Sequence, residues 1–111
     1  MALNYDLVII GAGPGGYTAA LKAAALGMRV VVVDKDKLGG ACINRGCIPT
    51  KALLYASNIF SMMQRSDQFG VSTDFISFDY AKMQEYKKRS VQKYRTEIEN
   101  LFRENGIDYI K

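Results

Sequence analysis

Residues 5–17 read Tyr-Asp-Leu-Val-Ile-Ile-Gly-Ala-Gly-Pro-Gly-Gly-Tyr, and this stretch decides the fold. The apolar run over residues 5–10 is rich in β-branched side chains, is bounded by glycine, and predicts a buried strand. Residues 11–16 match the pattern G-x-G-x-x-G, which is weak evidence alone but here leaves a strand and opens a helix. That placement predicts a phosphate-binding turn between the two elements.

Each glycine of this turn has an expected task. Gly11 permits the tight turn, Gly13 lets the backbone approach a pyrophosphate, and Gly16 lets the helix and the strand pack closely. The phosphates would lie at the positive helix N-terminus, where N–H donors are exposed. Asp34 ends the next strand, at the place where a carboxylate accepts a hydrogen bond from an adenosine ribose. The alternative is a glycine-rich turn followed by a surface aspartate.

The rest of the chain predicts an α/β fold with a parallel sheet. A helix over 14–26 is expected to begin with Pro14 and to end at Gly27, followed by a strand over 29–33 that is covered on both faces. Strand, helix and strand then form a Rossmann-like βαβ unit. A loop over 34–48, a helix over 49–65 and an irregular segment over 66–78 follow. A helix over 79–105 is capped by Ser77 or Asp79, and its apolar face holds Met83, Tyr86, Tyr94, Ile98 and Leu101. A third strand covers 107–110.

Composition narrows the function classes for these 111 residues. The net charge is +4, but the only basic cluster, Lys87-Lys88-Arg89, is more typical of a solvated helix face than of a nucleic-acid surface. No apolar run approaches the ~20 residues of a membrane helix, and the start does not resemble a secretory leader. We therefore expect a cytoplasmic protein with no metal, nucleic-acid or membrane site. Because the chain has no histidine, it cannot supply an imidazole base.

The two cysteines lie in residues 39–51, Gly-Gly-Ala-Cys-Ile-Asn-Arg-Gly-Cys-Ile-Pro-Thr-Lys. Their spacing does not match the usual zinc or thioredoxin motifs. Five helical steps rise ~7.5 Å, more than the ~4.4–6.8 Å between Cα atoms that a disulfide allows. A bridge between Cys42 and Cys47 therefore needs a distorted turn, which Gly46 and Pro49 would permit. Such a small loop adds little stability, so a bridge here would be reducible and catalytic. The alternative is two buried structural thiols.

The two quoted stretches resemble the flavin-dependent pyridine nucleotide–disulfide oxidoreductases, and most closely their dihydrolipoyl dehydrogenase branch. Thr50 before Lys51 is similar to that branch, whereas Ala41 replaces a threonine that many relatives carry. Beyond Ser57 the resemblance is one of layout. It implies that residues 1–111 form the N-terminal part of an FAD-binding domain, and that the NAD and interface domains are absent from this chain.

The resemblance also implies roles for individual residues. Cys42 would be the interchange thiol that forms a mixed disulfide with the substrate, and Cys47 would be the charge-transfer thiolate against the flavin. Lys51 would lie beside the flavin ring near N5, where an ammonium stabilises the reduced ring. The other residues expected to bind FAD are Gly11, Gly13, Pro14, Gly15 and Gly16 at the pyrophosphate, Asp34 and Lys35 at the adenosine ribose, and Gly39, Gly40 and Ala41 along the ribityl path.

In the complete enzyme, the resemblance implies oxidation of dihydrolipoamide and reduction of NAD by a homodimer. The partner would be a lipoamide-bearing protein of a 2-oxoacid dehydrogenase or glycine cleavage system. The chain alone is expected to be inactive. Two alternatives stay open at this stage: another flavin disulfide reductase, such as a mercuric reductase, and a nucleotide-binding module without catalysis.

Overall fold

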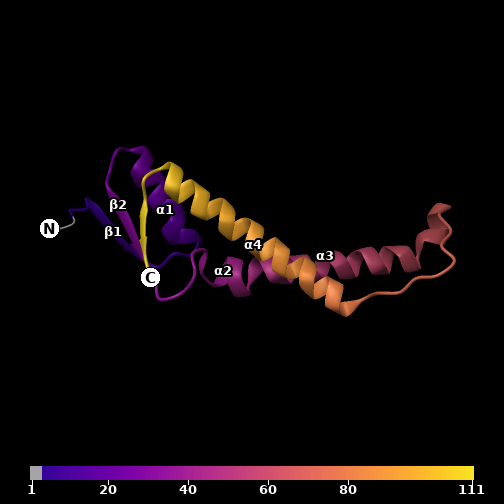
Figure 1. Ribbon diagram of the computed structural model, residues 1–111. Coiled ribbons are helices and arrows are strands. Elements are labelled where there is room, and N and C mark those ends of the chain that lie inside the picture. The colour runs from indigo at the N-terminus through magenta and orange to yellow at the C-terminus, as the bar shows by residue number, and fades with distance from the viewer. Residues whose placement is uncertain (1–3) are drawn as a thin grey trace.

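A parallel three-stranded sheet forms one end of the molecule (Figure 1). The structure is a computed structural model that describes residues 4–111. The strand order is β1 (Leu7–Ile10), β2 (Val30–Val33), β3 (Asp108–Ile110), and the register pairs Leu7 with Val30 and Val31 with Asp108. The predicted α/β class, the βαβ unit and the third strand are confirmed.

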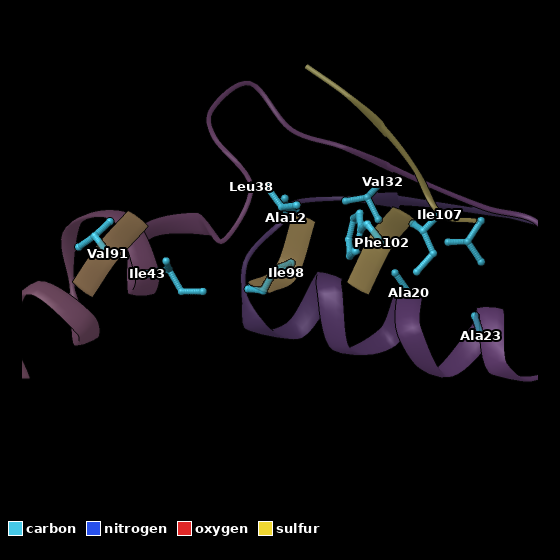
Figure 2. Packing of buried hydrophobic residues seen from close by; sticks show 11 residues of the cluster. Ala12, Ala20, Ala23, Val32, Leu38, Ile43, Val91, Ile98, Phe102 and Ile107 are labelled. Atoms are coloured by element: carbon cyan, nitrogen blue, oxygen red, sulfur yellow. The ribbon is translucent and has the colours of Figure 1, made fainter. Parts of the chain in front are cut away.

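Two helices cover the same face of this sheet. Helix α1 (Pro14–Ala25) connects β1 to β2, and α4 (Tyr80–Glu104) leads into β3. Figure 2 shows their side chains meeting those of the central strand. The shared core includes Ala20 and Ala23 from α1, Val30 and Val32 from β2, and Ile98 and Phe102 from α4.

The opposite face of the sheet corrects the prediction of a buried strand over 5–10. The strand begins at Leu7, and Val8 and Ile10 are 56% and 90% exposed. Successive strand side chains point to opposite faces, and both helices lie on the Leu7 and Ile9 side. By contrast, Val30 to Val32 are buried, as expected for the strand predicted over 29–33, whereas Val33 is half-buried. The Tyr5 hydroxyl donates to Asp108 Oδ2 at 2.7 Å, so this side chain passes over β2 on the more exposed face.

The helix ends follow the predicted capping signals. Pro14 is the first residue of α1, and Gly27 follows its end with φ +86°. The Asp79 side chain accepts from the Lys82 N–H at the start of α4, and Gly106 follows its end with φ +63°. Helix α3 (Cys47–Gln64) holds Pro49 in its first turn. The prediction of a loop over 34–48 is wrong in part, because α2 (Gly40–Arg45) forms there.

Helix α3 and the first part of α4 form an arm that extends away from the sheet (Figure 1). A 3-10 turn (Ser66–Phe69) and an irregular segment connect them. The predicted apolar face of α4 is wrong in part: Val91, Ile98 and Phe102 are its buried side chains, whereas Tyr86, Tyr94 and Leu101 are exposed. Helix α4 packs on α2 and α1 as well as on α3, and these contacts bury the side of the helix that carries residues 91, 98 and 102. Within the described residues, no helix is long and apolar enough to cross a membrane.

Candidate functional site

The glycine turn joins β1 to α1 through close backbone contacts. Gly11 has φ +110°, in the left-handed region that favours glycine, and its N–H donates to the Val33 carbonyl at 2.8 Å. A Cβ atom at Gly16 would lie 1.8 Å from the Gly11 carbonyl oxygen and 3.4 Å from Ile9 Cγ2. Only glycine at position 16 lets α1 approach the strand this closely.

The N-terminus of α1 is open on the side of the turn. Gly13 is its N-cap residue and supplies no side chain to cap the first N–H groups, which have no partners inside the helix. Gly15 is exposed, and a Cβ atom there would meet nothing within 4 Å. Uncapped donors, a positive helix end and free space fit a pyrophosphate group.

The segment after β2 packs directly on this turn. The Gly39 N–H donates to the Ala12 carbonyl at 2.9 Å, and Gly39 has φ +108°. A Cβ atom at Gly40 would lie 2.5 Å from Gly13 Cα. These glycines therefore have a packing role, which brings the start of α2 against the predicted phosphate-binding turn. The sequence reasoning assigned them to cofactor binding alone.

Asp34 stabilises the same junction. Its carboxylate accepts from the Ala12 N–H at 2.7 Å and from the Asp36 N–H at 3.0 Å. These two hydrogen bonds, with the Ala12 bond the stronger cause, hold the pKa of Asp34 below its ordinary value. Each oxygen keeps a lone pair, so the carboxylate can still accept from a ribose hydroxyl. The neighbouring Lys35 is exposed.

Asp34→Asn is expected to weaken the dependence of the free energy of unfolding on pH in the acid range. Because the folded pKa is depressed, the stabilising contribution of the carboxylate is complete above the ordinary value of 3.8 and is lost as the pH falls through the lower folded pKa. Urea unfolding midpoints between pH 6 and pH 2 measure this effect. Asp74→Asn, at an exposed position between α3 and α4, is the control. Parallel curves for Asp34→Asn and the unmodified chain would show that Asp34 does not contribute.

The two cysteines form a disulfide where one helix ends and the next begins. Cys42 lies in α2 and Cys47 is the first residue of α3. Gly46 separates the helices with φ −123° and ψ −103°, and the two Cα atoms are 4.7 Å apart. The distorted turn that a disulfide between these two cysteines requires is therefore present, and it lies at Gly46. A Cβ atom at Gly46 would lie 3.1 Å from the Ala41 carbonyl oxygen, so the turn is also tightly packed.

The two sulfur-bearing residues differ in exposure. Cys47 is exposed and Cys42 is half-buried. Lys51 is also exposed and lies one helical turn beyond Cys47, so both side chains project from the same side of α3. The buried Ile43 anchors the intervening turn of α2 in the core. Cys47 thus lies on an open face of α3, whereas Cys42 lies closer to the body of the domain.

Asn44 is a site residue that the sequence reasoning missed. Its Nδ2 donates to the carbonyls of Lys37, Leu38 and Gly40 at 3.3, 3.2 and 2.9 Å. Its Oδ1 accepts from Arg95 Nε at 2.9 Å and Nη2 at 2.5 Å. Asn44 therefore ties the disulfide-bearing turn both to the segment after β2 and to α4. The position of Asn44 between the two cysteines could have indicated a role at the site. The sequence could not indicate its partner Arg95, which lies 51 residues away.

Charged and aromatic groups fix the segment around Asp36. Its carboxylate is 2.7 Å from Arg45 Nη1, and the Lys37 N–H and then Arg45 lower its pKa. The Tyr109 hydroxyl donates to the Asp36 carbonyl. Burial, followed by the nearby Asp34 and Asp36 charges, raises the pKa of Tyr109. Within the described part of the chain, no cluster of three or more His, Cys, Asp or Glu side chains could hold a metal ion.

Comparisons with known proteins agree with this architecture. The family model for pyridine nucleotide-disulphide oxidoreductases matches residues 5–111. Similar relatives include the dihydrolipoyl dehydrogenases of Bacillus subtilis (strain 168), 44% identical over 97% of this chain, and Staphylococcus aureus, 46% identical over 98%. That of Geobacillus stearothermophilus is 41% identical over 99%. The chain covers 23% of each of these relatives. A glycine turn, a parallel sheet and this match over nearly the whole chain show that it belongs to the pyridine nucleotide-disulphide oxidoreductase family.

Proposed function

We propose that this chain is the FAD-binding, redox-disulfide module of a dihydrolipoyl dehydrogenase. The observation that carries the proposal is the Cys42–Cys47 disulfide at the α2–α3 break, on a helix whose start packs against the glycine turn. Simple nucleotide binding needs no cysteine pair, so this disulfide favours redox chemistry over a passive module. Residues 1–111 would form the N-terminal part of the FAD-binding domain, and NAD and interface domains would complete the enzyme.

The residues of the turn fit FAD. Its pyrophosphate would lie at the open α1 N-terminus, over Gly11, Gly13, Pro14, Gly15 and Gly16. Asp34 and Lys35 would bind the adenosine ribose, Gly39 to Cys42 would line the ribityl path, and Cys47 and Lys51 would face the ring. When bound, FAD supplies the two-electron acceptor for the reduced cysteines and the donor for NAD.

The cysteines would react by thiol–disulfide exchange. A thiolate of dihydrolipoamide attacks Sγ of Cys42, the Cys42–Cys47 bond breaks, and Cys47 leaves as a thiolate. The second sulfur of the substrate then displaces Cys42, which closes the cyclic disulfide of lipoamide and leaves both cysteines reduced. Two electrons pass from the substrate to the cysteine pair. Because the chain has no histidine, an imidazole base for the substrate protons would have to come from outside these residues.

The exchange step can be tested without turnover. We expect dihydrolipoamide to reduce the oxidised chain, so that subsequent alkylation adds two groups in the mass spectrum, at Cys42 and Cys47. The chain alone should not sustain NAD reduction, because a missing acid–base group typically costs ~10²–10⁴-fold in rate. Reduction by dithiothreitol but not by dihydrolipoamide would contradict the proposed substrate. Sustained NAD reduction would contradict the proposal that the chain is one module of the enzyme.

The remaining features belong to the same proposal. A lipoamide-bearing protein of a 2-oxoacid dehydrogenase or glycine cleavage system would deliver the substrate, and the complete enzyme would be a homodimer. The cytoplasmic location expected from the sequence stays a prediction. Pull-down of the complete enzyme with a lipoylated domain, and sedimentation of that enzyme, measure the first two.

A further inference from the structure

A hollow of about 550 Å³ lies between α2, the start of α3 and the middle of α4. Its walls carry four cationic side chains, Arg45, Lys87, Lys88 and Arg95, and two amides, Asn44 and Gln92. None of the described residues that line it carries a carboxylate. Pro49 and Val91 complete the wall, and Val91 is 9% exposed. The hollow therefore combines a concentrated positive charge with a partly apolar floor.

The three residues of the basic cluster 87–89, which the sequence analysis interpreted as a solvated helix face, do not all lie on the same side of α4. Lys87 and Lys88 line the hollow, whereas Arg89 does not. Lys87 is half-buried, and Lys93, further along the same helix, is exposed and also outside the hollow. Lys88 and Arg89 are exposed, as expected for a solvated helix face, so the interpretation needs correction only at Lys87. Helical geometry turns neighbours by about 100°, so adjacent cations separate onto different faces.

Arg95 is fixed in place before any ligand arrives. Its Nε and Nη2 donate to Asn44 Oδ1, and its Nη1 donates to Gln92 Oε1 at 3.0 Å. These bonds use three of the five guanidinium N–H groups, which leaves one on Nη1 and one on Nη2 for another acceptor. A guanidinium held by neutral amides keeps its full charge. It also loses little side-chain entropy when it binds an anion.

The charge of the hollow is only partly compensated within the protein. Arg45 pairs with Asp36 at 2.7 Å, but among the described residues Lys87, Lys88 and Arg95 have no ion pair. Lys87 donates to the neutral amide of Gln84. Like charges around one hollow raise its energy, and a bound anion lowers it.

We propose that this hollow binds a phosphate-class dianion. The oxygens of the ligand would accept hydrogen bonds from the two remaining N–H groups of Arg95 and from the ammonium groups of Lys87 and Lys88. Pro49 and Val91 would limit the access of water. The site is built from α2, α3 and α4 and uses no residue of the glycine turn, so it is separate from the expected FAD pyrophosphate site. Two sources share this chemistry: free inorganic phosphate and the phosphate of a phosphomonoester.

The test compares two double variants with the same loss of charge on the same helix. Lys87→Gln/Lys88→Gln removes charges that line the hollow, whereas Arg89→Gln/Lys93→Gln removes charges that do not. Glutamine keeps a similar helix propensity, so both variants should stay folded. Inorganic phosphate and glycerol 3-phosphate are titrated into each chain by calorimetry at constant ionic strength, without FAD, and circular dichroism monitors the fold.

We expect saturable binding to the unmodified chain, at least tenfold weaker binding to Lys87→Gln/Lys88→Gln, and less than twofold change in Arg89→Gln/Lys93→Gln. Tighter binding of glycerol 3-phosphate would identify a phosphomonoester as the source, and equal or weaker binding would identify the free ion. If both double variants lost the same amount of affinity, the loss would reflect net charge alone, and the proposal would be overturned. Undiminished binding in both would place the anion elsewhere, for example at the glycine turn, and no saturable binding would also overturn it. None of these outcomes depends on the disulfide chemistry.

Discussion

Cys42→Ser in the complete enzyme is expected to abolish oxidation of dihydrolipoamide while leaving the flavin in contact with a reactive sulfur. Removing the residue that forms the covalent intermediate can cost on the order of 10⁶ in kcat. The remaining Cys47 thiolate should still give a long-wavelength absorption band with the flavin. Cys47→Ser should lose that band. Steady-state rates and absorption spectra of the two purified variants measure both effects.

These two variants decide which cysteine reacts with the substrate and which one contacts the flavin. Cys47 is the more exposed of the two residues, so exposure alone would make it the sulfur that the substrate attacks. The proposal instead has a flavin covering the open face that Cys47 shares with Lys51, which leaves Cys42 for the substrate. Loss of the band in Cys42→Ser and its survival in Cys47→Ser would reverse the roles. Circular dichroism of both variants controls for the missing disulfide.

Gly16→Ala is expected to be the most destabilising single substitution in the glycine turn. The added methyl group would lie 1.8 Å from the Gly11 carbonyl oxygen, so either α1 or β1 must move. Over-packing of this kind costs roughly 1–3 kcal/mol and occasionally more, and a contact with backbone belongs at the upper end. Gly15→Ala is the matched control, because a Cβ atom there meets nothing within 4 Å. It should be neutral or stabilising by up to about 1 kcal/mol.

Gly13→Val separates packing from binding in the same experiment. Gly13 has φ −77° and ψ −174°, which any residue adopts, and a Cβ atom there would meet only Gly40 Cα, at 3.9 Å. The variant should therefore fold, while its branched side chain occupies the approach to the α1 N-terminus and lowers the flavin content. Urea unfolding and equilibrium dialysis with FAD measure the two effects. Equal stability of Gly16→Ala and Gly15→Ala would contradict the packing argument, and equal flavin content in Gly13→Val would contradict the phosphate-binding role.

Local sequence signals predicted the elements that local chemistry controls. Pro14 and Gly27 mark the ends of α1, and Asp79 caps α4, because each acts on the backbone of its own turn. The four valines of β2 are typical of a parallel strand inside a sheet, and the first three of them are buried. The break at Gly46 was also predictable, since two cysteines five residues apart cannot be bridged along a regular helix.

Long-range packing decided what the sequence left open. Residues 5–10 have the composition of a buried strand, yet Val8 and Ile10 are exposed because both helices lie on one face of the sheet. The apolar stripe of α4 could be drawn through Tyr94 or through Val91, and the packing of α4 on α1 and α2 selected the side that holds Val91, Ile98 and Phe102. Residue type alone cannot say which side of an element will find a partner.

The sequence by itself determined the glycine turn and the cysteine pair, because each depends on residues within about 15 positions of one another, and these two stretches together indicated the family. Only the tertiary structure showed that Gly40 packs against Gly13, that Asp34 binds the Ala12 N–H, and that Arg95 fixes Asn44 across 51 residues. The same folding collected Arg45, Lys87, Lys88 and Arg95 around one hollow. Such contacts join segments that are distant in the chain, so they exist only once β2 has placed α2 on the turn and α4 has returned to the sheet.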